Sequence, residues 1–351
     1  PAAPLPDGSL PADPTDAMEA EVAALLAAAG AGSARAHAEG EEALALKELS
    51  LEEARERRAR LAKMRSLLFF AEAKAKRLAK IKSKGEITLG TRDSSGALAF
   101  TIGDGKYVGF HTEMDENISA DIQKQLGLPK LTVNKQLVTS QNRIPLVVNG
   151  TVDLECGSTT NNADRQKQVS YAPTTFVTAN RIVYKKTSGI KKLADLKGKT
   201  LVSTAGTTNI KQITELNAAQ NLGINIVSAN GHAEAFLMVE TGRAAAFAMD
   251  DILLAGLVAN AKTPGDYEIS SEALSVEPYG IMIRKDDPKF KQVVDSAIAA
   301  LMSSGQINGI YNTWFEKPIA PKGINLSIPI SPSLKRVMAK PTDSPDPKVY
   351  E

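Results

Sequence analysis

Short hydrophobic runs alternate with helix-like amphipathic segments between residues 85 and 315. Runs with the length and β-branched character of buried strands cover 86–90, 131–138, 152–156, 181–184, 200–203, 224–227, 245–249 and 279–284. Helical patterns cover 115–126, 140–150, 193–199, 210–221, 233–240, 290–303 and 307–315. Because strands alternate with helices, the pattern predicts an α/β fold with parallel sheets.

Two of the predicted strands end in small polar loops, 157–162 (GSTTNN) and 204–209 (TAGTTN). A loop between a strand end and a helix N-terminus presents backbone N–H donors, which can bind an anion. Arg165, in the first turn of the next predicted helix, adds a guanidinium that can hold a carboxylate. This favours a seat for a small anion, although such loops are also typical of simple turns and helix caps.

The polar loops recur in two separate blocks, which predicts two lobes that face one cleft. We place the first lobe at 85–178 plus 277–330 and the second at 179–276, with a loose proline-rich tail at 331–351. Residues 1–47 are expected to be mostly disordered with one short helix, and the start at Pro1 indicates a trimmed or fused product.

Residues 48–84 are predicted to form one long, basic helix. A capping box at Ser50 and Glu53 begins it, and neither Gly nor Pro follows before Gly85. Lysines and arginines far outnumber acids after residue 55, and the apolar seam is narrow. Such a helix fits a protein partner, nucleic-acid phosphates or a solvated linker.

Composition removes several classes of function. One cysteine excludes an intrachain disulfide, and three histidines with one cysteine disfavour a His/Cys zinc site. No apolar run approaches the roughly 18 residues of a membrane span. The net charge of +2 points to no partner by itself. We therefore expect no metal and no cofactor.

The N-terminal part resembles a known family. Residues 49–58 (LSLEEARERR), 69–77 (FFAEAKAKR) and 80–84 (KIKSK) resemble the fourteenth U-three-associated protein, a eukaryotic scaffold of the small-subunit processome. The resemblance covers 15–84. It implies a nucleolar source and a ribosome-biogenesis protein, such as an RNA helicase, or an RNA as the partner of 48–84.

A second resemblance covers residues 78–330. The segments 78–95 (LAKIKSKGEITLGTRDSS), 139–168, 242–256 (GRAAAFAMDDILLAG) and 279–291 are similar to bacterial periplasmic glutamate/aspartate-binding proteins of ABC importers. The resemblance implies the two-lobed type II periplasmic-binding-protein fold, which closes over one L-glutamate or L-aspartate and delivers it to an ABC permease. A periplasmic monomer without catalytic activity is expected.

The second resemblance also implies a role for each site residue. Arg165, Thr160 and Thr208 would hold the α-carboxylate, and Asp250 and Ser158 the α-ammonium. The side-chain carboxylate would lie among Arg92, Ser140, Arg143 and His232. Buried charges must be paired, and three arginines with one aspartate match two carboxylates and one ammonium. A neutral amino acid would leave Arg92 and Arg143 unpaired.

Several alternatives remain open at this level. Asp251 could replace Asp250, and His232 could merely cap a helix. Residues 80–84 fit both families, so we hypothesise a fusion near 78–85, although a natural composite chain also fits. An enzyme related to cyclic-acid dehydratases is a second class of function, with His232 as its candidate acid or base. A third class makes the N-terminal segment the functional part and the binding protein its carrier.

Overall fold

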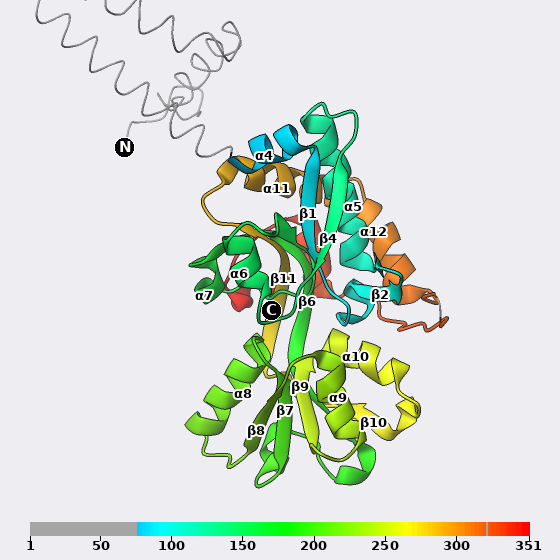
Figure 1. Cartoon of the computed structure of the whole chain (residues 1–351). Helices are drawn as coiled ribbons and strands as arrows, with labels where there is room; N and C mark the ends of the chain where they lie inside the picture. Colours follow the sequence, from blue (N-terminus) through cyan, green and yellow to red (C-terminus); the bar gives the residue numbers. More distant parts are fainter. Residues whose placement is uncertain (1–75, 321) are drawn as a thin grey trace, which may run out of the picture. The chain divides into compact units, whose positions relative to one another are not determined.

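A computed structural model describes residues 76–320 and 322–351, and one large mixed sheet organises them (Figure 1). The strands are β1 (Glu86–Thr91), β2 (Phe100–Gly103), β3 (Lys106–Val108), β4 (Thr132–Leu137), β5 (Leu154–Glu155), β6 (Val169–Lys185), β7 (Thr200–Thr204), β8 (Asn225–Ala229), β9 (Ala246–Asp250), β10 (Tyr267–Ile269) and β11 (Ser275–Arg284). The order in the large sheet is β4-β1-β5-β11-β6-β9-β7-β8, with β10 beside β6 and a separate β2–β3 hairpin.

The sheet is parallel only at its two ends. β1 pairs in parallel with β4 and β5, and β7 pairs in parallel with β8 and β9. Between these groups, β6 and β11 run antiparallel to each other and to their outer neighbours β9 and β5. The prediction of parallel sheets was therefore wrong for the centre, where two long strands replace a helical crossover.

β6 and β11 join an upper and a lower group of elements in Figure 1. The upper group contains β1 to β5, and the lower group contains β7 to β10; we call them the first and second lobes. The predicted lobe boundaries fall inside the paired strands, at Thr178–Glu277 and Ala179–Val276. Those boundaries stay predictions; β6 and β11 are the strands that connect the two groups there.

The helices cover the sheet and lie near their predicted positions. They are α4 (Lys76–Lys84), α5 (Phe110–Gln125), α6 (Arg143–Val148), α7 (Ala163–Gln166), α8 (Thr208–Ala219), α9 (His232–Glu240), α10 (Asp251–Asn260), α11 (Pro288–Ser303), α12 (Gln306–Tyr311) and α13 (Pro332–Ala339). Helix α5 begins five residues before the predicted start, and α10 was not predicted at all. None of the helices in 76–320 and 322–351 is long and apolar enough to cross a membrane.

Apolar side chains pack on both sides of the central strands. The largest cluster includes Phe110, Phe176 and Phe315, whose rings lie 5.2 to 6.2 Å apart between centroids. A smaller cluster around Leu201 and Ile213 fills the second lobe. Burial at this level supplies the main driving force for folding, at about 25 cal/mol per Å² of apolar surface.

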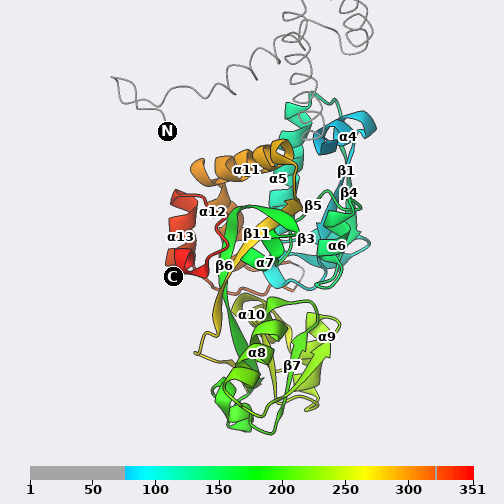
Figure 2. The ribbon, with the colours of Figure 1, turned by 90° about the vertical axis from the view of Figure 1, so that its left-hand side faces the viewer.

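The segment 331–351 is not a loose tail, contrary to the prediction. It forms α13 (Figure 2). The side chains of Leu334, Val337 and Tyr350 are buried. The backbone N–H of Thr174 in β6 donates to the carbonyl of Thr342 at 2.8 Å. The prolines suggested disorder, but the segment satisfies its polar groups against β6 and buries an apolar face.

Helix α4 belongs to the first lobe. Ile81 is fully buried in the main core, and Arg77 forms a buried ion pair with Asp153 in the turn before β5. The backbone N–H of Arg77 also donates to Asp287 at 3.0 Å. Of the predicted helix 48–84, this is the portion that the structure describes; the rest, like 1–47, lies outside the described residues.

Candidate functional site

A small cavity lies where the two lobes meet. Seven of the nine predicted site residues line it: Ser140, Arg143, Ser158, Thr160, Thr208, His232 and Asp250. The cavity has a volume of about 10 Å³, which is the space of roughly one water molecule. At Gly206, where φ is +75°, an added Cβ would lie 2.8 Å from the backbone of Gln141. The lobes therefore touch, and an amino acid can enter only if they separate.

The first-lobe wall contains two buried arginines on neighbouring segments. Arg143, the first residue of α6, donates from Nη1 to the carbonyl of Ser158 at 2.9 Å and to Thr159 Oγ1 at 2.7 Å. Arg165 in α7 donates to the carbonyl of Thr160 at 2.8 Å. Burial, reinforced by the charge of Arg165, lowers the pKa of Arg143 to about 9, so it stays protonated at neutral pH.

The predicted anion seat at the helix after β5 needs a correction. Helix α7 has only four residues, so its dipole is weak, and the Asn162 side chain already accepts the backbone N–H of Arg165. The donors that this loop offers to an anion are therefore the Arg165 guanidinium and the threonine hydroxyls. The loop before α8 is different, because that helix has twelve residues and begins beside the cavity at Thr208.

Arg92 and His232 connect the two lobes. Arg92 donates from Nη1 to Ser140 Oγ at 3.1 Å, and its Nη2 lies 3.2 Å from His232 Nε2. A guanidinium nitrogen only donates, so His232 Nε2 accepts and its Nδ1–H donates to Thr204 Oγ1 at 2.8 Å. Burial, followed by the charges of Arg92 and Arg143, lowers the pKa of His232 well below its usual value. His232 is neutral and does not merely cap α9.

The second-lobe wall carries a buried acid. Asp250 accepts from Asn209 Nδ2 at 2.7 Å and from the Tyr279 hydroxyl. Burial and the nearby charge of Glu277 raise the pKa of Asp250 to about 7. Asp251 instead lies outside the cavity lining and pairs with Arg181 at 3.0 Å. The geometry therefore favours Asp250 of the two adjacent carboxylates.

Thr208 already uses its hydroxyl proton. It donates to Glu277 Oε2 at 2.9 Å, and its oxygen lies 3.4 Å from Thr160 Oγ1. A threonine has one O–H donor, so Thr208 cannot also donate to a ligand carboxylate while it is bonded to Glu277. In this arrangement its backbone N–H at the start of α8 is the better donor.

Sequence reasoning missed four buried polar residues around the cavity: Glu155, Asn209, Glu277 and Tyr279. Glu155 and Glu277 each stand among apolar residues of a strand, and an acid there must be compensated by partners. The sequence therefore contained a sign that Glu155 and Glu277 are buried polar residues with partners. Asn209 and Tyr279 had no comparable signal, because both types also occur as ordinary loop and core residues.

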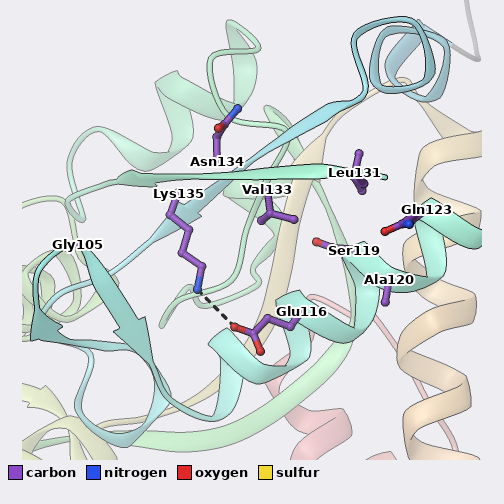
Figure 3. Close-up of a pocket in the computed structure, with 9 residues that line it drawn as sticks. All are labelled: Gly105, Glu116, Ser119, Ala120, Gln123, Leu131, Val133, Asn134 and Lys135. Carbon is purple, nitrogen blue, oxygen red and sulfur yellow. Dashed lines mark ion pairs between the residues drawn. The ribbon is translucent and has the colours of Figure 1, made fainter. Parts of the chain in front are cut away.

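A larger hollow of about 590 Å³ lies elsewhere in the first lobe, between β4 and α5 (Figure 3). Lys135 and Glu116 reach toward each other across it, 3.6 Å apart. No arginine lines it, and the charges of the half-buried Lys135 and the exposed Glu116 compensate each other. Size alone therefore does not decide the site, and the interlobe cavity has the chemistry that this hollow lacks.

Comparison with known proteins identifies the family. The model of the bacterial extracellular solute-binding proteins, family 3, matches residues 87–317. The chain belongs to this family. This solute-binding protein is 49% identical to the L-glutamate/L-aspartate-binding protein of Pseudomonas aeruginosa, over 76% of the chain and 88% of that protein. It is 42% identical to the glutamate/aspartate import solute-binding protein of Escherichia coli K12, over 78% of the chain and 90% of that protein.

Solved structures agree on the fold. A mutant of ArgBP from T. maritima aligns with a TM-score of 0.61 and 28% identity, over 68% of this chain and 99% of that one. An ancestral arginine-binding protein aligns with a TM-score of 0.59 and 27% identity, over 66% of this chain and 98% of that one. The predicted two-lobed type II periplasmic-binding-protein fold is confirmed.

The N-terminal part has a match of its own. The model described as Utp14 protein matches residues 9–85, which confirms the first resemblance as a similarity. That match ends at residue 85, and the solute-binding match begins at residue 87. The Utp14 match includes α4, which is packed into the first lobe. The two similarities therefore meet at the junction of α4 and β1, within the first lobe.

Proposed function

We propose that the solute-binding protein holds L-glutamate or L-aspartate between its lobes. The observation that carries this proposal is the charge pattern of the cleft, with buried arginines on the first-lobe wall and buried Asp250 on the second. In this proposal Arg165, Thr160 and Thr208 hold the α-carboxylate, and Asp250 and Ser158 hold the α-ammonium. Arg92, Ser140, Arg143 and His232 surround the side-chain carboxylate.

The charges favour an acidic ligand over its amide. Arg92 and Arg143 each have a buried Nε without a hydrogen-bond partner in the described structure. A side-chain carboxylate would compensate both guanidinium charges, whereas an amide would compensate neither. The names of the relatives from Pseudomonas aeruginosa and Escherichia coli support the same ligand class.

Binding requires a hinge motion in this proposal. The cavity is too small for an amino acid, and β6 and β11 provide the connection about which the lobes would separate. Closure would then bury the ligand, and the closed form would deliver it to an ABC permease. We place the mature binding protein in the periplasm as a monomer.

Calorimetry tests the proposal directly. The whole chain should bind L-glutamate or L-aspartate one-to-one, with L-glutamine at least about a hundredfold weaker because two buried guanidinium groups lose their counter-ion. Arg143→Met should remove most of that preference, and Arg284→Met, at an exposed arginine outside the cavity, should leave it unchanged. Equal affinity for glutamate and glutamine in the wild type would contradict the proposal.

We propose no catalysis at this site. His232 was the candidate acid or base, but both of its ring nitrogens are engaged and its low pKa keeps it neutral. A general base needs a free nitrogen within reach of the substrate proton. Prolonged incubation with glutamate followed by mass spectrometry should return the ligand unchanged; a new product would favour the dehydratase-like alternative.

Residues 9–85 suggest a second, separate candidate function. Their similarity to the Utp14 model favours an interaction segment for a ribosome-biogenesis protein or RNA, with the binding protein as carrier. The whole chain should then capture a processome component from nucleolar extract, and a chain that begins at residue 76 should not. Equal capture by both would exclude the segment as the cause. The fusion near 78–85 stays a hypothesis, which the encoding genomic DNA would test.

A further inference from the structure

Glu155 is a fully buried acid behind the first-lobe wall of the cleft. It is the last residue of β5, where it pairs in register with Gly90 of β1. It does not line the interlobe cavity. Burying a carboxylate is costly unless it is compensated, so the position of Glu155 requires an explanation.

Thr159 links Glu155 to the binding wall. The Thr159 hydroxyl donates to Glu155 Oε2 at 2.5 Å, and the same oxygen accepts from Arg143 Nη1 at 2.7 Å. A threonine hydroxyl has a single proton. Because Glu155 takes that proton, the lone pairs of Thr159 are left for Arg143, and the guanidinium is held in one orientation.

The second oxygen of Glu155 approaches Arg92. Oε1 is buried without a hydrogen-bond partner in the described structure. An added Cβ at Gly157 would lie 2.4 Å from this oxygen and 2.6 Å from Arg92 Cγ, so both groups pack against the same glycine. Burial lowers the pKa of both Arg143 and Arg92, and the negative charge of Glu155 partly opposes that lowering.

We propose that Glu155 is a positioning residue that, through Thr159, fixes the Arg143 guanidinium and thereby sets the selectivity of the cleft for an acidic over an amide side chain. This inference rests on the proposed function of the same cleft. Glu155 does not touch the ligand, and its effect reaches the ligand through two hydrogen bonds.

The test is the ratio of the Kd values for L-glutamine and L-glutamate in three variants. Thr159→Val removes both hydrogen bonds, and Glu155→Met removes the acceptor; each should lower the ratio about tenfold, the usual effect of one hydrogen bond to a charged group. Glu155→Gln keeps an oxygen that can accept from Thr159, so it should retain the ratio within about threefold. Glu155→Gln and Glu155→Met remove the same charge, and their difference isolates the hydrogen-bond chain.

Thr112→Val is the matched control. Thr112 is also buried in the first lobe, but its hydroxyl has no partner in the described structure, so the ratio should not change. Melting temperatures of all variants separate lost stability from lost selectivity. An unchanged ratio in Thr159→Val, or equal losses in Glu155→Gln and Glu155→Met, would overturn the inference. A wild type without preference for glutamate would instead overturn the proposed function.

Discussion

The two walls of the cleft differ in the charge of their buried side chains and in the groups that hydrogen-bond to those side chains. The first-lobe wall contains three buried arginines on three segments, Arg92, Arg143 and Arg165. The second-lobe wall presents Asp250, a buried acid, and His232, a neutral imidazole. A further buried acid, Glu277, accepts from Thr208 at the start of α8. The wall with cations is held by backbone carbonyls and hydroxyls, whereas the wall with the acid is held by amide and phenol donors.

Because of this difference, the cleft is positively charged on its first-lobe side and negatively charged on its second-lobe side. Carboxylates of a ligand are attracted to the first lobe, and an ammonium is attracted to the second. In the proposed function, an amino acid therefore satisfies both walls in one orientation and joins the lobes. The following variants test the contrast, from the largest expected effect to the smallest.

Removing the arginine that is proposed to bind the α-carboxylate of every amino-acid ligand should have the largest effect on affinity. Arg165→Met should weaken L-glutamate and L-glutamine alike by at least about a hundredfold, because both share the α-carboxylate that loses its buried partner. Titration calorimetry measures the affinities for both ligands. Lys167→Met, at an exposed lysine two residues away, is the control. A loss confined to glutamate would place Arg165 at the side-chain carboxylate instead.

Neutralising the acid of the second wall should come next. Asp250→Asn should weaken the binding of L-glutamate by about thirtyfold at pH 8, because the ligand ammonium loses its counter-ion. In the wild type the raised pKa of Asp250, about 7, means that the group is protonated below that pH and must release its proton when an ammonium binds. Wild-type affinity should therefore fall about tenfold per unit below pH 7, while the variant stays flat in that range. Parallel slopes would exclude Asp250 as the ammonium partner.

Crowding the first wall should have an intermediate effect. Gly157→Ala places a methyl group against Glu155 and Arg92, so Arg92 must shift and glutamate should bind about tenfold more weakly. Gly231→Ala, before α9 on the second lobe, meets nothing within 4 Å and should change the Kd by less than about twofold. Equal effects at both glycines would show that the two walls do not differ in how closely they pack.

Changing the neighbouring acid should have the smallest effect. Asp251→Asn removes the partly exposed pair with Arg181 and should alter the Kd by less than about threefold. The same variant should lower the free energy of unfolding by less than about 1 kcal/mol, as measured by urea denaturation. A loss of binding as large as that of Asp250→Asn would reverse the assignment of the two carboxylates.

Local patterns in the sequence predicted much of the fold but not its centre. The runs at 86–90 and 200–203 were short, apolar and bounded by polar turns, and they form β1 and β7 nearly as predicted. β6 was predicted only at 181–184, because Pro173 and a run of threonines interrupt its apolar pattern, yet the strand begins at Val169. Pairing with β11 decided that segment, and such pairing is not visible in a local window.

The sequence by itself determined the alternation of strands and helices and the polar loops at strand ends, and its resemblance to glutamate/aspartate-binding proteins supplied three arginines and one aspartate as candidates. Only the tertiary structure decided that Arg92 contacts His232, 140 residues away, that Asp250 rather than Asp251 lines the cavity, and that α13 docks on β6. The physical reason is that propensity and hydrophobic period are local properties. Burial and charge compensation, in contrast, depend on residues that are distant along the chain.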